Sequence, residues 1–383
     1  MSEIETVEGW ASELKVLGSR IGRRFERSEP RERAIAYLKG LMSDVHRKNG
    51  WQLAEQAGEA TPDGMQRLLS TAVWDVEGVR DDLRDYVVET LGSEHGVLVL
   101  DESGFLKKGT HSVGVKRQYS GTAGRVENCQ VGVFLGYASE KGQALIDRAL
   151  YLPQEWVADA ERCREAKIPE DMPFATKPEL GRQMLGCAFA AGVPARWVTG
   201  DSIYGGDRRL RLWLEEQGRW FVLGIRKDDP LWSGFYQRRA DARAAALPGD
   251  AWQRLSCGAG AKGPRVYDWA LLLLPRWGQS ADVLHALLVR RSVADGELGY
   301  FVVFAPAGTS LQTLVTIAGM RWTIEECFEV GKNETGLDEY EVRHWLGWYR
   351  HITLSMLALA FLSTTRCQAL HLDGTKKQVA CGG

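Results

Sequence analysis

The sequence predicts an α/β (α+β) protein built on a mixed β-sheet. Residues up to about 92 have helical periodicity, and near residue 96 the pattern changes to period two. Neighbouring strands then precede alternating helices and strands, which is typical of a mixed sheet. The expected parts are a helical domain at 1–92, the first part of the core at 93–226, a β-rich insertion at 227–298, the second part of the core at 299–366 and a disordered tail at 367–383.

The composition is that of an ordinary globular chain and leaves the function open. The 383 residues are 44% hydrophobic and 26% charged, and the formal net charge is -2, so any basic surface must be local. The seven cysteines form no CxxC pair, and their odd number is against a disulfide framework. The N-terminus lacks the pattern of a signal peptide, and the longest apolar run, at 352–362, is too short to span a bilayer. We therefore expect a cytoplasmic protein.

The N-terminal helices have two features that bear on DNA binding. Arginines with interleaved glutamates crowd residues 20–33, which is typical of a DNA-backbone surface and equally of a salt-bridged, solvent-facing helix. Further on, Thr61 is a credible N-cap and Pro62 a first-turn residue, so that two short helices around Gly58 form a candidate helix-turn-helix. Its second helix carries Gln66, Arg67 and Ser70. Many helix pairs that do not bind DNA have this pattern, so both interpretations stay open.

The first part of the core begins with strands joined by glycine-rich turns. The period-two pattern predicts these strands at 97–101, 111–118, 129–138 and 144–151. A helix at 177–191 and a strand at 195–201 follow. Another helix begins at Asp207, and GRWFVLGI is the strand after it.

The rest of the chain predicts an insertion and two helical segments. The insertion contains short apolar runs and tryptophans at 232, 252, 269 and 277. YFVVFA at 300–305 returns to the sheet, and one long helix is expected from Ser310 to about 333. A further apolar helix covers 344–366, and the polar tail after it is expected to be disordered.

Two aspartates lie at the carboxyl ends of predicted core strands. Asp101 ends the apolar run of LVLDESGF, and Asp201 follows the strand in WVTGDSIYGGD. An acid in such a place often only caps a turn or helix. Two of them, each after a central strand, can instead converge at the sheet edge where ligands of α/β sheets commonly lie.

A third carboxylate comes from RWTIEECFEVGK on the predicted long helix. Charges that face the core are unfavourable unless partnered. One narrow stripe of this helix contains Arg321, Glu325, Phe328 and Lys332. Glu326 points about 100° away from this stripe and is interpreted as a solvent residue. Glu329 lies at an intermediate angle, so its role as a site residue stays open.

These acids suggest metal-assisted phosphoryl transfer on a polyanion. Two aspartates and a glutamate supply the hard oxygens suited to Mg²⁺ or Mn²⁺, and such triads can hold two ions ~3.5–4 Å apart. A basic segment follows the first acid, without an acidic residue between 103 and 126. A DNA backbone would suit it, although a solvated hairpin remains the alternative. Its cations are Lys107, Lys108, Lys116, Arg117 and Arg125.

The chain resembles the DDE transposases of bacterial insertion sequences, most closely insertion sequence family 701, which is related to family 4. The family 4 signature is Tyr-x2-Arg-x3-Glu-x6-Lys, and Arg321, Glu325 and Lys332 have its spacing. The Tyr position is occupied by Ala318. The segments DESGFLKKGTHSVGVKRQYSGT and GDSIYG resemble the blocks that contain the two catalytic aspartates, and the similarity runs from about residue 30 to 362.

The resemblance implies a ribonuclease-H-like fold with a β-rich insertion between the second and third acids. It implies that Asp101, Asp201 and Glu325 hold two Mg²⁺ or Mn²⁺ ions for cleavage and strand transfer, while Arg321 and Lys332 position phosphates. The implied partners are double-stranded DNA, as terminal inverted repeats and target, and a second copy of the chain in a DNA-bound homodimer. In related enzymes a tryptophan of the insertion can stack on a flipped base. The resemblance does not show which of the four tryptophans of this insertion would do so.

Two other functions stay open from the sequence. An aspartyl-phosphate phosphatase of the haloacid dehalogenase type also uses an aspartate after the first strand, but it needs Asp-x-Asp, and residue 103 is Ser. A catalytically impaired, transposase-derived DNA-binding protein is the other. The tail is short for the family, which leaves a truncated copy as an alternative.

Overall fold

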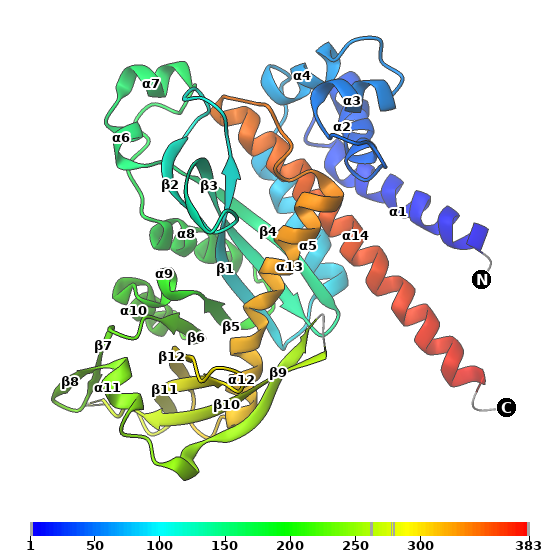
Figure 1. The fold of residues 1–383 in the computed structure, drawn as a ribbon. Helices are drawn as coiled ribbons and strands as arrows, with labels where there is room; N and C mark the ends of the chain where they lie inside the picture. The colour runs from blue at the N-terminus through cyan, green and yellow to red at the C-terminus, as the bar shows by residue number, and fades with distance from the viewer. Residues whose placement is uncertain (1–2, 261–262, 277, 279, 381–383) are drawn as a thin grey trace.

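The structure is a computed structural model and describes residues 3–260, 263–276, 278 and 280–380. The chain begins with helices, as the sequence predicts (Figure 1). These are α1 (Glu3–Gly22), α2 (Ser28–Leu41), α3 (Gly50–Gln56), α4 (Asp63–Ser70) and α5 (Val76–Leu91). Side-chain caps fix where two of them start: Asn49 accepts from the backbone N–H of Trp51 and Gln52 before α3, and Asp75 accepts from Gly78 at the start of α5.

The predicted Thr61 cap is wrong. Helix α4 begins at Asp63, and Pro62 occupies the N-cap position in a helical conformation. The Thr61 hydroxyl donates to Asp63 Oδ2 at 3.3 Å instead of accepting from a backbone N–H. The predicted pair of short helices around Gly58 is nevertheless present as α3 and α4.

One large mixed sheet forms the centre of the molecule (Figure 1). Its first strands are β1 (Gly96–Leu106), β2 (Lys116–Ser120), β3 (Arg125–Ser139), β4 (Gly142–Tyr151), β5 (Ala195–Gly200) and β6 (Trp220–Ile225). Strand β3 pairs antiparallel with both β1 and β4, while β1, β5 and β6 run parallel. The order β4-β3-β1-β5-β6 with these directions is the ribonuclease-H-like arrangement, so the predicted fold class is confirmed.

Burial explains why the first strand sits in the middle of this sheet. Val97, Leu98, Val99 and Leu100 have no exposed surface, because neighbouring strands flank β1 and helices cover its faces. Burying one such side chain contributes about 1.5–3 kcal/mol. The helices between the strands are α6 (Gln154–Val157), α7 (Ala160–Glu165), α8 (Lys177–Ala190), α9 (Ser202–Gly205) and α10 (Arg208–Glu216).

The predicted β-rich insertion is also present, and most of its strands extend the central sheet. Strand β12 pairs antiparallel with β6, and β11, β10 and β9 follow outward in that order. A separate hairpin and two short helices complete this region. The elements are β7 (Pro230–Ser233), β8 (Tyr236–Arg239), α11 (Ala240–Ala244), η1 (Gly249–Ala251), β9 (Gln253–Gly260), β10 (Gly263–Leu273), β11 (Val283–Ser292) and β12 (Leu298–Pro306).

The structure corrects several boundaries in the predicted elements. Strand β1, predicted at 97–101, continues to Leu106, so Asp101 lies within the strand rather than at its end. Strand β2 begins at Lys116 rather than at 111, because Gly114 has φ +74° and turns the chain before the strand. The expected single helix from Ser310 is two helices, α12 (Leu311–Met320) and α13 (Trp322–Thr335), which meet at Arg321. At this break the Thr323 hydroxyl donates to the carbonyl of Met320 at 2.7 Å.

The predicted disordered tail is wrong over most of its length. Helix α14 (Trp345–Ala380) continues through residues 367–380, and residues 381–383 lie outside the described part of the chain. The apolar first half of this helix packs alongside α5 and over β4 (Figure 1). Helical hydrogen bonding continues from that packed half into the polar second half, which the loss of apolar periodicity did not indicate.

Candidate active site

Asp101 and Asp201 lie next to each other at one edge of the sheet. Strands β1 and β5 are parallel, with Leu100 opposite Gly200. Asp101 is the next residue of β1, and Asp201 is the first residue after β5. Local hydrogen bonds hold both side chains. Asp101 Oδ1 accepts from the N–H of Glu102 at 2.8 Å, and Asp201 Oδ1 accepts from Ile203 at 2.9 Å at the start of α9. The sheet register therefore brings together two carboxylates that are 100 residues apart in the sequence.

Negative charge accumulates at this edge. Burial, and then the charge of Asp201, raise the pKa of Asp101 to about 7, although Arg321 opposes the shift. Burial raises the pKa of Asp201 as well, followed by the charge of Glu102. Nearby cations do not compensate the carboxylates fully, so the edge is suited to a cationic ligand.

Arg321 connects the third predicted acid to the first. Its Nη1 lies 3.4 Å from Asp101 Oδ2, and its Nη2 lies 2.7 Å from Glu325 Oε1. Glu325 thus belongs to the same ionic network. Within the part of the chain that the structure describes, no three Asp, Glu, His or Cys side chains are grouped closely enough to hold a metal ion. Glu325 is therefore paired with Arg321 and, in the described chain, is not grouped with the two aspartates as a metal site.

Glu102 is a further carboxylate of this edge that the sequence interpretation did not include. Alternation along β1 turns it away from Arg321, and it faces α8 and α9 instead. Lys177 Nζ lies 2.9 Å from its Oε1, and the buried Tyr204 hydroxyl donates to its Oε2 at 3.1 Å. Tyr204 belongs to the GDSIYG segment, so a conspicuous motif did contain a partner of Glu102.

The predicted basic residues are placed in different environments. Lys108 and Arg117 are exposed, and within the described chain neither forms an ion pair. Lys116 is paired with Glu155, and Arg125 lies 2.8 Å from Glu127. All four lie on the segment around β2 and the start of β3.

Lys107 and Lys332 contact the protein itself. Lys107 Nζ lies 3.5 Å from the ring centre of Tyr340 and donates to its carbonyl at 3.1 Å, while burial lowers the pKa of Lys107 to about 8. Lys332 Nζ donates to the Thr122 hydroxyl at 2.8 Å, which joins α13 to the turn between β2 and β3. Ala318, at the Tyr position of the signature, is buried on α12.

The N-terminal arginines support the salt-bridged interpretation over much of the cluster. Arg20 pairs with Glu89, and Arg33 with Glu59. Asp82 pairs with both Arg23 and Arg24. On the second helix of the candidate helix-turn-helix, the predicted side chains Gln66, Arg67 and Ser70 are exposed, and so is the acidic Asp63.

The tryptophans of the insertion differ in exposure. Trp269 is buried, and Trp252 lies under the guanidinium of Arg291 at 4.2 Å. Trp232 on β7 is 46% exposed. Trp277 lies outside the described residues.

The strand order and the paired aspartates define a protein of the ribonuclease-H-like class with an acidic site at the sheet edge. The family described as DDE superfamily endonuclease matches residues 21–256, more than half of the chain. The chain belongs to this family. No helix among the described residues has the length and apolar character needed to cross a membrane.

Individual proteins are similar to this chain as well. The probable transposase for insertion sequence element IS701 from Microchaete diplosiphon is 28% identical over 202 residues, which are 51% of this chain and 49% of that protein. The chain therefore spans about half the length of this relative, and the resemblance to insertion sequence family 701 is confirmed. The cryo-EM structure of the piggyBac transposase synaptic complex with hairpin DNA has a TM-score of 0.46 at 10% identity, over 87% of this chain and 64% of that chain.

Proposed function

We propose that the protein is a DNA transposase that cleaves DNA at the ends of a mobile element and joins the freed ends to target DNA. One observation carries the proposal: parallel strands place Asp101 and Asp201 side by side, in the family of DDE endonucleases. DNA cleavage and strand transfer are both phosphoryl transfers, in which two divalent ions can activate the attacking oxygen and stabilise the leaving oxygen.

The chemistry of the site fits divalent metal ions. Asp101 and Asp201 offer hard oxygen ligands. Burial, and then neighbouring negative charge, raise the pKa of both, and a bound cation would favour their ionised forms. We propose that these two aspartates would hold Mg²⁺ or Mn²⁺, with Glu325 as a third ligand. Arg321, which contacts Asp101 and Glu325, would contact a phosphate oxygen.

The residues around the acids would bind and orient the DNA. Lys108, Lys116, Arg117 and Arg125 would contact backbone phosphates, since charge-assisted contacts of this kind supply much of the affinity for DNA. Lys332 would hold the β2–β3 turn next to the site through Thr122. Lys107 is not included in this interface, because it is partly buried and donates to the carbonyl of Tyr340. Inverted repeats, target DNA and a DNA-bound homodimer are the proposed partners, and the exposed face of α4 is a further candidate contact.

The structure offers less to the phosphatase alternative. That class also needs an aspartate four or five residues after the Asp of its Gly-Asp pair, whereas Asp207 is six residues after Asp201. Asp207 accepts from the N–H of Leu210 at 2.9 Å as the cap of α10. Ser103, where that class needs an aspartate, is buried. The DNA-binding alternative differs from the proposal only in lacking cleavage.

Cleavage of terminal-repeat DNA tests the proposal. We expect Mg²⁺-dependent strand cleavage by the wild-type chain and its loss in Asp201→Ala and Glu325→Ala. Glu326→Ala is the matched control, because Glu326 is the adjacent acid and binds Gln143 at 2.8 Å away from the site. Undiminished cleavage by Asp201→Ala would exclude the assignment. DNA binding without cleavage by the wild-type chain would support the DNA-binding alternative instead.

A further inference from the structure

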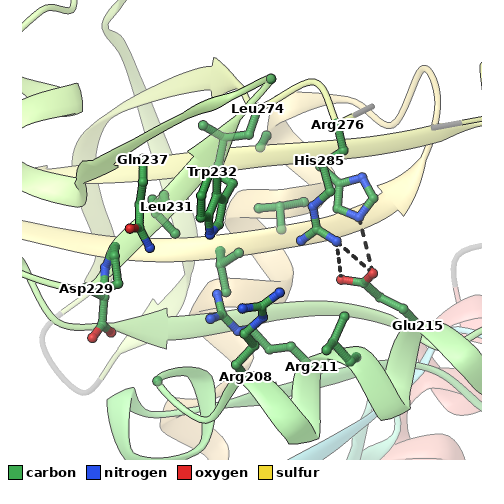
Figure 2. A pocket seen from close by; sticks show the side chains of 17 residues that line it. Arg208, Arg211, Glu215, Asp229, Leu231, Trp232, Gln237, Leu274, Arg276 and His285 are labelled. Atoms are coloured by element: carbon green, nitrogen blue, oxygen red, sulfur yellow. Dashed lines mark hydrogen bonds and ion pairs between the residues drawn. The ribbon is translucent and has the colours of Figure 1, made fainter. Parts of the chain in front are cut away.

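A pocket of about 480 Å³ lies between α10, the β7–β8 region and strands β11 and β12 (Figure 2). Gly206, which lines it, is five residues after Asp201. Asp229, another lining residue, follows the end of β6, which is parallel to β5. The pocket is therefore near the same edge of the sheet as the candidate active site, but separate from its carboxylates.

Positive charge exceeds negative charge in this pocket. It is lined by three arginines and two carboxylates, namely Arg208, Arg211, Arg276, Glu215 and Asp229. Glu215 already accepts two hydrogen bonds from Arg276, at 2.8 and 3.1 Å. Asp229 accepts from the backbone N–H of Arg226 at 2.9 Å. Arg208 and Arg211 also line the pocket, and among the described residues neither forms an ion pair with Glu215 or Asp229.

Arg211 is the least satisfied of these side chains. Its Nε is buried and has no hydrogen-bond partner among the described residues. Burial lowers the pKa of Arg211, and the neighbouring charge of Arg276 lowers it further. The charges of Asp229 and Glu215 partly oppose this shift. Leaving the buried Nε–H without an acceptor is costly, and a bound anion would remove that cost.

His285 is a second polar side chain without a hydrogen bond in the pocket. It is only 8% exposed, and neither ring nitrogen is within hydrogen-bond distance of a partner in the described part of the chain. Its Nε2 stands 3.6 Å from Glu215 Oε2. In Figure 2 the arginines of α10 extend from below towards Trp232, with His285 to one side of them. A ligand between them would find N–H donors from two directions.

We propose that this pocket binds a phosphate group, with Arg208 and Arg211 as its principal partners and His285 as a further donor. Guanidinium groups suit phosphate because their N–H donors match its oxygens in pairs. A DNA backbone and a free nucleotide or phosphate share this chemistry. The choice of phosphate over other anions rests on the proposed function, because a DNA strand bound at Asp201 would pass close to this pocket.

Binding measurements in EDTA test the proposal without requiring cleavage. The probes are inorganic phosphate, followed by thermal shift, and a short duplex DNA, followed by fluorescence anisotropy. Phosphate should raise the melting temperature of the wild-type chain. Arg211→Gln should weaken phosphate binding about tenfold or more, because a charged hydrogen-bond partner is lost. Without phosphate this variant should melt no lower than wild type, since it removes an unpaired charge.

Arg209→Gln is the matched control, because Arg209 is exposed on the same helix and does not line the pocket. It should bind phosphate like wild type. Arg208→Gln, at an exposed position, provides a second variant should Arg211→Gln fail to fold.

The DNA probe distinguishes the sources of the phosphate. If Arg211→Gln weakens the binding of both probes and phosphate competes with DNA, the ligand is the DNA backbone. If this variant weakens phosphate binding alone, the ligand is a free phosphate compound. Both results support phosphate binding in this pocket. Wild-type affinity of Arg211→Gln and Arg208→Gln for phosphate, or no binding by the wild-type chain, overturns it. Loss of cleavage alone would concern only the proposed function.

Discussion

Single residues at the sheet edge show which parts of the site a sequence reveals. Asp101 and Asp201 could be predicted, because each follows an apolar run and the two runs pair as parallel strands in register. The contacts of Glu102 could not be predicted, because its partners come from other elements. Lys177 and Tyr204 meet it only after α8 and α9 pack beside β1. Tertiary packing, which has no local pattern, supplies this part of the site.

The raised pKa of Asp101 leads to a prediction about stability. The pKa of this carboxyl group is raised to about 7 in the folded chain, so its protonated form favours folding. That contribution to stability is present at low pH and is lost as the pH rises through 7. We expect Asp101→Asn, in EDTA, to be more stable than wild type at pH 8 by an amount on the order of 2–4 kcal/mol. At pH 4 the difference should nearly vanish. Urea denaturation at both pH values measures it.

Asp207→Asn is the control for this prediction. Asp207 caps α10 away from the acidic edge, so its replacement should give no stabilisation that grows from pH 4 to pH 8. A pH-independent effect of Asp101→Asn would show that Asp101 is ionised normally in the folded chain.

At the scale of helices and strands, apolar periodicity predicted most of the core. The buried runs that became β1, β3, β5 and β6 lie where the sequence put them. The break at Arg321 was missed, because the residues on both sides are helical and only a side-chain hydrogen bond marks the interruption. The early start assigned to β2 ignored the left-handed conformation of Gly114.

The contact between α9 and β6 gives a prediction at this scale. A Cβ on Gly205 would stand 1.9 Å from the carbonyl oxygen of Gly224, so α9 rests directly on the strand. We expect Gly205→Ala to displace α9, which begins beside Asp201, and to destabilise the fold by about 1–3 kcal/mol or more. DNA cleavage should fall as well. Thermal unfolding followed by circular dichroism measures the stability.

Gly249→Ala is the matched control, because a Cβ there meets no atom within 4 Å. It should unfold close to wild type. If Gly205→Ala were equally stable, the close approach of α9 to β6 would not be a constraint in solution.

At the scale of the whole molecule, one sheet connects the acidic edge with the insertion. Strand β12 pairs with β6, so the insertion strands continue the sheet that carries Asp101 and Asp201. The basic residues around β2 lie at the opposite end of the strand order from β9. With an overall charge of -2, the proposed DNA affinity would come from such local surfaces rather than from net charge.

Salt dependence tests the basic surface around β2. Lys108→Gln and Arg117→Gln should each reduce the slope of log K against log salt concentration by about 1 for duplex DNA, because each removes one phosphate contact. Lys141→Gln, in the turn between β3 and β4, should leave the slope unchanged. Fluorescence anisotropy at several salt concentrations gives the slopes, and identical slopes for all three variants and the wild type would place the DNA elsewhere.

The pairing of Asp101 with Asp201 as a metal site is tested most directly by Mn²⁺ binding to the chain in the presence of DNA, measured by electron paramagnetic resonance. We predict specific binding by the wild-type chain and a loss of about tenfold or more in affinity for Asp101→Asn and for Asp201→Asn. Glu326→Gln should bind Mn²⁺ like wild type. Wild-type affinity in both aspartate variants would contradict a metal site where Asp101 of β1 lies beside the end of β5.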